Sequence, residues 1–200
     1  MSERFALLND DRLNAIRPII TARLQEAAGL VGGGAFEEFF DGTMQALLRD
    51  GLNRIGAHEG TVWLLDPTRT FLMPRFNTGP NSSELVGRFR QSLRSGMISM
   101  VVATEQPICE NEVQKNQQQD KTLDRQLGLL TCTMIAVPFY FTGEMRGVVS
   151  AVRLKAAGAA DEPAGFGLED LEALQLATTV LTRMIEYRLL SLVLGREGLG

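Results

Sequence analysis

The chain has 200 residues, and at about 150 residues per domain this predicts one domain with an appended segment. Hydrophobic residues make up 44% and charged residues 22%. This is the mixture of an ordinary globular protein, so a disordered, collagen-like or coiled-coil chain is excluded. The formal net charge of -4 argues against attraction of the whole protein to nucleic acid or to an anionic membrane surface.

Neither a membrane span nor a metal site is expected. The longest apolar stretch, residues 134–141, is interrupted by a proline and is far shorter than the roughly 20 residues of a spanning helix. The N-terminus turns acidic at Asp10 and Asp11 before any long apolar run, which argues against a secretory signal. Cys109 and Cys132 are too few for a disulfide framework and lack the nearby histidines of a zinc site. We therefore expect a cytoplasmic protein.

The N-terminal part of the chain has helical patterns. Apolar residues at helical spacing predict an amphipathic helix over residues 10–30, in which Pro18 predicts a kink or a fresh start. The consecutive glycines at 32–34 predict the end of this helix and a hinge. A second helix is expected over residues 36–55. We place an N-terminal helix and a glycine hinge in residues 1–34.

The next part of the chain mixes strand and helix patterns. Apolar runs at residues 61–65 and 71–73 flank an Asp-Pro-Thr-Arg turn and predict a β-hairpin. A helix is expected over residues 81–94 and a shorter one over 97–104. A short strand is expected at residues 107–109.

The last part of the chain contains the strongest strand pair. Residues 111–120 are almost entirely polar, so we expect a solvated or mobile loop there. The patterns at 131–141 and 147–154 predict two strands joined by a turn at 142–146. A segment of small residues then leads to a long helix over residues 168–194.

This last helix carries two apolar stripes. At about 100° per residue, leucine and isoleucine side chains form one stripe that can cover the sheet. A second stripe, rotated by roughly 120°, contains Leu176, Val180, Met184 and Tyr187. An exposed stripe of this size requires a partner. Two alternatives remain open: the N-terminal helix covers the stripe, or a second subunit covers it in a homodimer, and both can occur in one helical bundle.

Short motifs in the second half of the chain resemble those of GAF domains. Gly96 and the run Val-Val-Ala-Thr-Glu-Gln-Pro-Ile at 101–108 are similar to the family segment G … V-a-x-t-g-x-p-i. The run Met-Ile-Ala-Val-Pro-Phe at 134–139, then Gly143, then Gly-Val-Val-Ser-Ala at 147–151, is similar to the family signature l-x-v-P-l … g … G-v-l.

The resemblance continues into the last helix, where Phe166 and Asp170 are similar to the family ending F-x-x-x-D. It covers about residues 36–194. It implies an α+β fold of the GAF/PAS-like kind, with a central antiparallel sheet flanked by helices and with the N- and C-terminal helices forming a bundle. The GAF-like domain is then expected over 35–195, followed by a tail at 196–200.

The resemblance also implies a small-molecule pocket on one face of the sheet. The side chains expected to bind the ligand are Phe76, Met97, Ile98, Cys109, Cys132 and Met134, with Asn111 and Gln117 reaching in from the polar loop. Methionine adapts readily to the shape of such a wall. A set of arginines, Arg75, Arg88, Arg90 and Arg94, offers either a cationic rim for an anionic ligand or a solvated helix face.

The residues favour none of the cofactors known in the family. Members that bind cyclic nucleotides carry an Asn-Lys pair where this chain has Arg153 and Leu154. The only histidine, His58, is expected at an exposed helix end, whereas a haem ligand must lie inside the pocket. Neither cysteine has the neighbouring histidine of bilin-binding members. The cofactor is therefore unknown.

The sequence thus favours a non-enzymatic sensory or regulatory domain that binds an unidentified small molecule and dimerises through its terminal helices in signal transduction. A signalling protein is a further expected partner, whereas nucleic acid and membrane are not. Two alternatives remain open. One is an interaction module with a vestigial pocket, and the other is a thiol redox enzyme of the free methionine sulfoxide reductase type that uses Cys109 and Cys132.

Overall fold

The computed structural model describes residues 11–195, so the expected tail at 196–200 lies outside the described residues. The strands are β1 (Glu59–Leu65), β2 (Phe71–Asn77), β3 (Gln91–Ser92), β4 (Ile108–Glu110), β5 (Leu129–Phe141) and β6 (Glu144–Ala156). They form one antiparallel sheet of six strands in the order β3-β2-β1-β6-β5-β4. The predicted hairpin near residue 65 is the β1–β2 pair, and the predicted strand pair near residue 140 is β5–β6.

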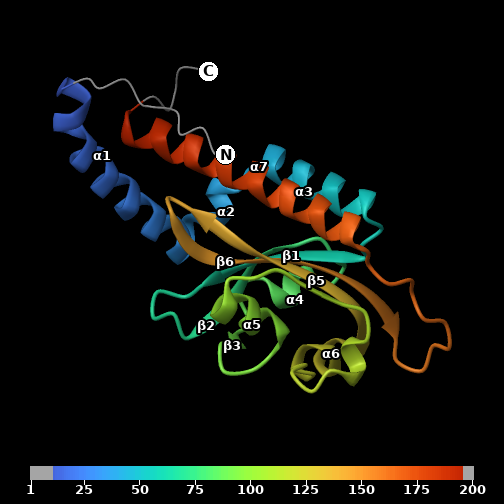
Figure 1. Ribbon diagram of the computed structural model, residues 1–200. Helices are drawn as coiled ribbons and strands as arrows, with labels where there is room; N and C mark the ends of the chain where they lie inside the picture. Colours follow the sequence, from blue (N-terminus) through green and yellow to red (C-terminus); the bar gives the residue numbers. More distant parts are fainter. Residues whose placement is uncertain (1–10, 196–200) are drawn as a thin grey trace.

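Helices cover both faces of this sheet (Figure 1). One face, called here the helical face, carries α1 (Asp11–Leu30), α2 (Phe36–Phe39), α3 (Gly42–Arg54) and α7 (Leu168–Val193). The opposite face, called here the cavity face, carries α4 (Ser82–Leu85), α5 (Met97–Thr104), a 3-10 turn (Val113–Lys115) and α6 (Thr122–Leu127). The predicted α+β class with terminal helices in a bundle is confirmed.

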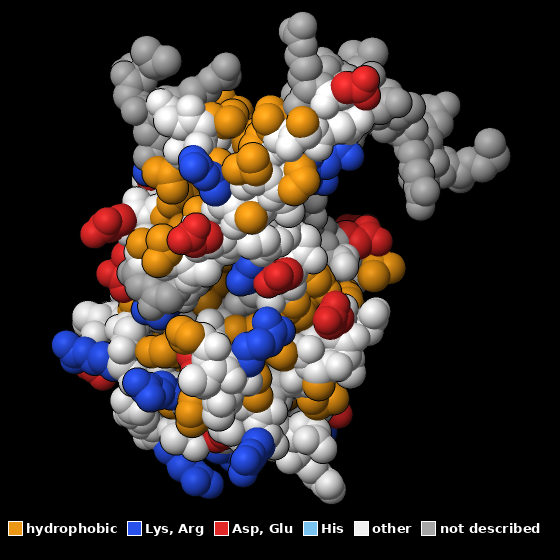
Figure 2. Space-filling model, turned by 90° about the vertical axis from the view of Figure 1, so that its left-hand side faces the viewer, with side chains coloured by type: hydrophobic (Ala, Val, Ile, Leu, Met, Phe, Trp, Pro, Cys, Tyr) orange, Lys and Arg blue, Asp and Glu red, His pale blue; other side chains and the backbone are white. Residues whose placement is uncertain are grey.

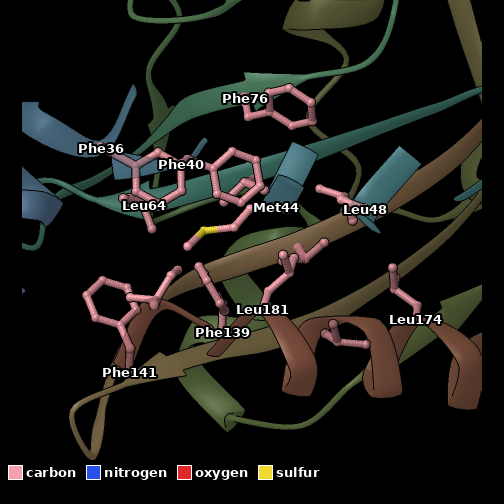
Figure 3. Close-up of a cluster of buried hydrophobic side chains, with 14 of the residues drawn as sticks. Phe36, Phe40, Met44, Leu48, Leu64, Phe76, Phe139, Phe141, Leu174 and Leu181 are labelled. Carbon is pink, nitrogen blue, oxygen red and sulfur yellow. The ribbon is translucent and has the colours of Figure 1, made fainter. Parts of the chain in front are cut away.

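The helical face contains the larger apolar core of the domain. Figure 3 shows side chains from α2, α3, α7 and the sheet converging on one volume. Phe36 and Phe40 stack with their ring centroids 5.0 Å apart, and Phe40 meets Phe76 of β2 at 5.1 Å. Leu174 and Leu181 of α7 are almost completely buried here. Most of the first apolar stripe of the last helix therefore covers the sheet, as its spacing predicted, whereas Leu192 near the end of the stripe is 44% exposed.

The expected helix over residues 36–55 is interrupted. The carboxylate of Asp41 accepts hydrogen bonds from the backbone N–H groups of Thr43 and Met44, both at 3.0 Å. It is the N-cap of α3, and an N-cap residue has an extended rather than a helical backbone. The break between α2 and α3 therefore has a local cause in one side chain.

The first helix, α1, ends at Leu30, just before the glycines, as expected. Val31–Ala35 forms a π-helical turn that joins α1 to α2, and the backbone remains right-handed at Leu30 and Phe36 on either side. A π-helical turn holds one more residue per hydrogen-bonded ring than an α-helix. The chain therefore stays wound through the glycines as far as Ala35, whose ψ of 5° departs from the helical range. Pro18 lies within α1.

The expected helix over residues 81–94 is wrong. Only Ser82–Leu85 is helical, because Gly87 has a φ of +72° and donates its backbone N–H to the Pro74 carbonyl. This left-handed conformation suits glycine and turns the chain out of the helix. The following residues then pair with β2 as the edge strand β3.

The hairpin between β5 and β6 is tighter than the predicted turn at 142–146. Only Thr142 and Gly143 separate the strands, and both have positive φ, 55° and 78°. Turns of this kind match the twist of the flanking strands. β6 therefore begins at Glu144, three residues earlier than expected. Pro138 lies beyond Ala136, the last β5 residue paired with β4, where its missing N–H breaks no bond of that ladder.

Candidate functional site

A cavity of about 70 Å³ lies on the cavity face. Residues 111–128, called here the cover segment, connect β4 to β5 and form part of the wall of this cavity. Its apolar lining consists of Trp63, Gly96, Met97, Ile98, Val113, Leu123 and Met134. Its polar lining consists of Gln91, Gln119, Asp120, Asp124 and Thr131. Apolar walls with a few convergent polar groups are typical of small-molecule sites.

Asp124 ties the cover segment to the start of β5. Its carboxylate accepts hydrogen bonds from the backbone N–H and the hydroxyl of Thr131 at 2.8 and 2.7 Å. It also accepts from the side-chain amides of Gln114 and Gln119 at 3.2 and 3.0 Å. Asp124 is partly buried, and such donors replace the water that burial removes from its carboxylate. One side chain therefore organises this end of the cover segment.

Asp120 ties the cover segment to the opposite wall. Its carboxylate accepts from Thr122, whose hydroxyl and backbone N–H lie at 2.6 and 3.0 Å, and from Gln91 and Ser95 at 3.2 and 3.1 Å. These hydrogen bonds, above all that of the Thr122 hydroxyl, lower the pKa of Asp120 to about 2. The polar loop predicted for 111–120 thus forms hydrogen bonds within the protein.

The residues expected to bind the ligand divide into two groups. Met97, Ile98 and Met134 line the cavity. Phe76 instead belongs to the core of the helical face, on the other side of the sheet. Gln117 is exposed on the cover segment and is not part of the lining.

Asn111 and the two cysteines also lie outside the cavity lining. Asn111 clamps the loop before α7, because its side-chain amide donates to the Phe166 carbonyl at 2.9 Å and accepts from the Phe166 N–H at 2.8 Å. The Cys109 thiol donates to the same carbonyl at 3.5 Å. Burial raises the pKa of both thiols, with Asp170 and Glu110 adding to the effect at Cys109. Thiols of raised pKa are poor nucleophiles at neutral pH.

Several cavity residues were not predicted from the sequence: Trp63, Gln91, Gln119, Asp120, Asp124 and Thr131. The available signal was the spacing of Asp120 and Asp124, four residues apart in a polar stretch that directly precedes a strand. The other members come from separate elements and meet only in the folded chain.

The arginines singled out in the sequence do not line the cavity. Arg88 and Arg90 flank an open hollow of about 500 Å³ that also contains Glu84, Phe89 and Gln126. The guanidinium of Arg153 has a structural role: it lies 4.1 Å from the centre of the Phe166 ring. It also donates to four backbone carbonyls, those of Ile55, Gly56, Ala164 and Gly165. The motif Phe166–Asp170 is therefore held together at the start of α7.

The second stripe of α7 is largely exposed. Leu176, Val180 and Tyr187 are 67%, 38% and 75% exposed, and Met184 is partly buried. The C-terminal end of α1 packs instead into the core of the helical face, where Ala28 and Leu189 are fully buried. Figure 2 shows apolar side chains gathered at the upper end of the molecule. Within the described residues, the N-terminal helix leaves Leu176, Val180 and Tyr187 uncovered.

Two further observations concern metal binding and membrane insertion. Between residues 11 and 195, no three side chains of His, Cys, Asp or Glu are grouped so that they could hold a metal ion. In the same part of the chain, none of the helices combines the length and the apolar character needed to cross a membrane.

The fold and the cavity define an α+β domain with a large apolar core on the helical face and a small cavity on the opposite face. A model of the GAF domain family matches residues 37–186, and the chain belongs to this family. Comparison with curated proteins gives no match.

Solved structures share the fold at low sequence identity. The GAF domain of an Acinetobacter phosphoenolpyruvate-protein phosphotransferase is 13% identical with a TM-score of 0.59, over 88% of this chain and 97% of that one. A type II free methionine-R-sulfoxide reductase from Thermoplasma acidophilum is 18% identical with a TM-score of 0.58, over 76% and 95%. The GAF domain of a phosphoenolpyruvate-protein phosphotransferase from Coxiella burnetii is 17% identical with a TM-score of 0.55, over 76% and 96%.

Proposed function

We propose that this chain is a non-enzymatic sensory domain of the cytoplasm that binds a small molecule in the cavity and forms a homodimer through α7 in signal transduction. The observation that carries the proposal is the cavity itself, part of whose wall is a cover segment tied down on two sides by Asp120 and Asp124. The non-enzymatic reading is supported by the cysteines, which lie outside the lining and have raised pKa values.

The dimer is supported by the second stripe of α7. Leu176, Val180 and Tyr187 expose apolar surface on one side of the helix. Beside them lies a hollow of about 330 Å³, lined by Asp41, Met44, Met184, Tyr187, Arg188 and Ser191. A twofold axis would place each copy of the stripe against the same stripe of its partner, and the exposed Tyr187 ring could enter the partner's hollow.

Strand β5 provides a physical connection between the two sites. It contributes Thr131 and Met134 to the cavity, and further along its Tyr140 carbonyl accepts a hydrogen bond from the Thr182 hydroxyl of α7 at 2.7 Å. A ligand changes the packing of α7 only if it binds two arrangements of the domain with different affinities. The change would then reach a signalling protein through the paired helices.

Native mass spectrometry of the full chain tests this proposal, because one spectrum reports both subunit number and bound mass. We expect a dimer, with added mass when a ligand is retained. Val180→Glu places a charge in the stripe and should give a monomer, whereas the control Gln175→Glu, exposed on another side of α7, should remain a dimer. A wild-type chain that stays monomeric at micromolar concentration would refute the dimer.

The small cavity volume favours a second candidate, an interaction module whose pocket is vestigial. In that case charged substitutions at Val180 and Met184 abolish function in cells, while apolar substitutions at Met97 and Met134 leave it intact. If the substitutions in the cavity have the larger effect, this candidate is rejected. The thiol enzyme is tested in the same assay by Cys109→Ser and Cys132→Ser, which we expect to be silent.

A further inference from the structure

The open hollow of about 500 Å³ beside Arg88 and Arg90, called here the arginine hollow, carries positive charge that the chain does not neutralise. Both side chains are exposed, and neither takes part in a salt bridge within residues 11–195. Residues 82–95 contain three arginines and one glutamate, although the formal net charge of the chain is -4. Positive charge is therefore concentrated here and accessible to a partner.

The backbone that carries these arginines is held in place from two directions. The Gly87 N–H donates to the Pro74 carbonyl at 3.0 Å, and the Phe89 N–H donates to the Leu85 carbonyl at 3.1 Å. The Phe89 ring also packs edge-on against Trp63, with the ring centroids 6.2 Å apart. A binding partner therefore does not have to order this backbone, and a preformed surface lowers the entropic cost of association.

The spacing of the arginines suits a ligand with two carboxylates. Arg88 and Arg90 are two residues apart in a non-helical segment, and both line the arginine hollow. A guanidinium group presents its N–H donors in a planar fork that can hold both oxygens of one carboxylate. In an extended peptide, side chains two residues apart point to the same side. Acidic side chains at that spacing can therefore meet the two arginines together.

The remaining lining favours a polypeptide over a nucleic acid. Glu84, Phe89 and Gln126 complete the arginine hollow. The Glu84 carboxylate repels a phosphate backbone, whereas it accepts hydrogen bonds from peptide N–H groups. The Gln126 amide both donates and accepts, as a peptide backbone requires, and the Phe89 ring offers apolar contact to aliphatic carbons. These groups match a peptide that carries carboxylates.

We propose that the arginine hollow is a docking surface for an acidic segment of a partner protein. Two carboxylates of this segment pair with Arg88 and Arg90, and its backbone bonds to Glu84 and Gln126. The arginine hollow shares no lining residue with the cavity and is not part of α7, so this inference goes beyond the proposed function and does not depend on it. Because the charges are exposed, salt weakens the association.

Amide chemical shifts of the ¹⁵N-labelled full chain test the proposal residue by residue. The chain is titrated at constant ionic strength with a blocked hexapeptide of alternating glutamate and alanine, with the same peptide carrying glutamine instead of glutamate, and with a single-stranded oligonucleotide of six thymidines. We expect saturable shifts in residues 84–91 and 122–128 with the glutamate peptide, and much weaker binding of the other two. Absence of these shifts, or equal or tighter binding of either control, would overturn the inference.

Two double variants separate the arginine hollow from the net charge. Arg88→Gln with Arg90→Gln should weaken binding of the glutamate peptide about tenfold or more, because charge-assisted hydrogen bonds are lost. The matched control, Arg17→Gln with Arg23→Gln, removes the same charge from exposed positions of α1 and should bind as the wild type does. Thermal melting of both shows whether the fold is retained. Equal losses in the two double variants would contradict the assignment to the arginine hollow.

The variant Val180→Glu separates this inference from the proposed dimer. Its substitution lies on α7, on the opposite face of the sheet, and it should bind the glutamate peptide with wild-type affinity. If the wild type is a monomer and binds the peptide, the dimer is wrong and the docking surface stands. If it is a dimer and does not bind the peptide, the docking surface is wrong and the dimer stands.

Discussion

Strand β5 contributes to both faces of the sheet, and the two faces differ in what they bury. Towards the helical face it presents Ile135 and Val137, which join an apolar core. Towards the cavity face it presents Met134 and Ala136, which adjoin the cavity and its polar lining. The same strand therefore supports dense packing on one side and a hydrogen-bonded network on the other.

The two faces are expected to contribute to different properties of the domain, namely stability and binding. The helical face removes large apolar side chains from water, and this burial of apolar surface is the dominant favourable term in the free energy of folding. On the cavity face the partly buried carboxylates of Asp124 and Asp120 accept hydrogen bonds from Thr131 and Thr122, and space remains beside them. Networks of this kind stabilise a unique geometry only when their members are paired. We expect stability to depend mainly on the helical face and binding on the cavity face.

The largest expected effect tests this division by the same truncation on each face. Leu181→Ala empties a fully buried position of the core, and we expect a loss of about 3 to 5 kcal/mol in the free energy of unfolding. Leu123→Ala only enlarges the existing cavity from a partly buried position, and we expect a loss of about 1 kcal/mol. Urea unfolding of both variants gives the comparison. Equal losses would show that the two faces do not differ in this way.

A smaller effect is expected from the pH dependence of the cover segment. The hydrogen bonds of the Thr122 hydroxyl, together with those of Gln91 and Ser95, hold the pKa of Asp120 at about 2, below its ordinary value of 3.8. A lowered pKa contributes stability above the ordinary value, and this contribution is lost as pH falls through the folded pKa. Wild type and Asp120→Asn should therefore differ in melting temperature at pH 6 and converge near pH 2. A difference that is constant over this range would show that the Asp120 charge has no such role.

Much of the fold followed from local sequence patterns. The alternation and turn residues around Asp66 predicted the β1–β2 hairpin, and the 3.6-residue period of α7 predicted which of its side chains cover the sheet. Patterns failed where one residue redirected the chain. Gly87 ended a helix that the apolar spacing of its neighbours favoured, and the side chain of Asp41 divided another.

The cavity was less predictable, because its lining comes from elements far apart in the sequence. Met97 and Met134 were found through family motifs, whereas Trp63 of β1 and Gln91 of β3 reach the same cavity only through strand pairing. Phe76 was assigned to the wrong side of the sheet for a related reason. The pairing of β1 with β2 has a register shift, because Val62 pairs with Phe76 while the next residue, Trp63, pairs with Pro74. The face of the sheet on which Phe76 lies depends on this shift.

Amide hydrogen exchange of the full chain tests the difference between the two faces most directly. We expect the slowest exchange in α3 and α7, which pack on the apolar core, and faster exchange in the cover segment, which is held mainly by side-chain hydrogen bonds. Equal protection of the two faces, or slower exchange in the cover segment than in α3, would contradict the assignment of stability to the helical face.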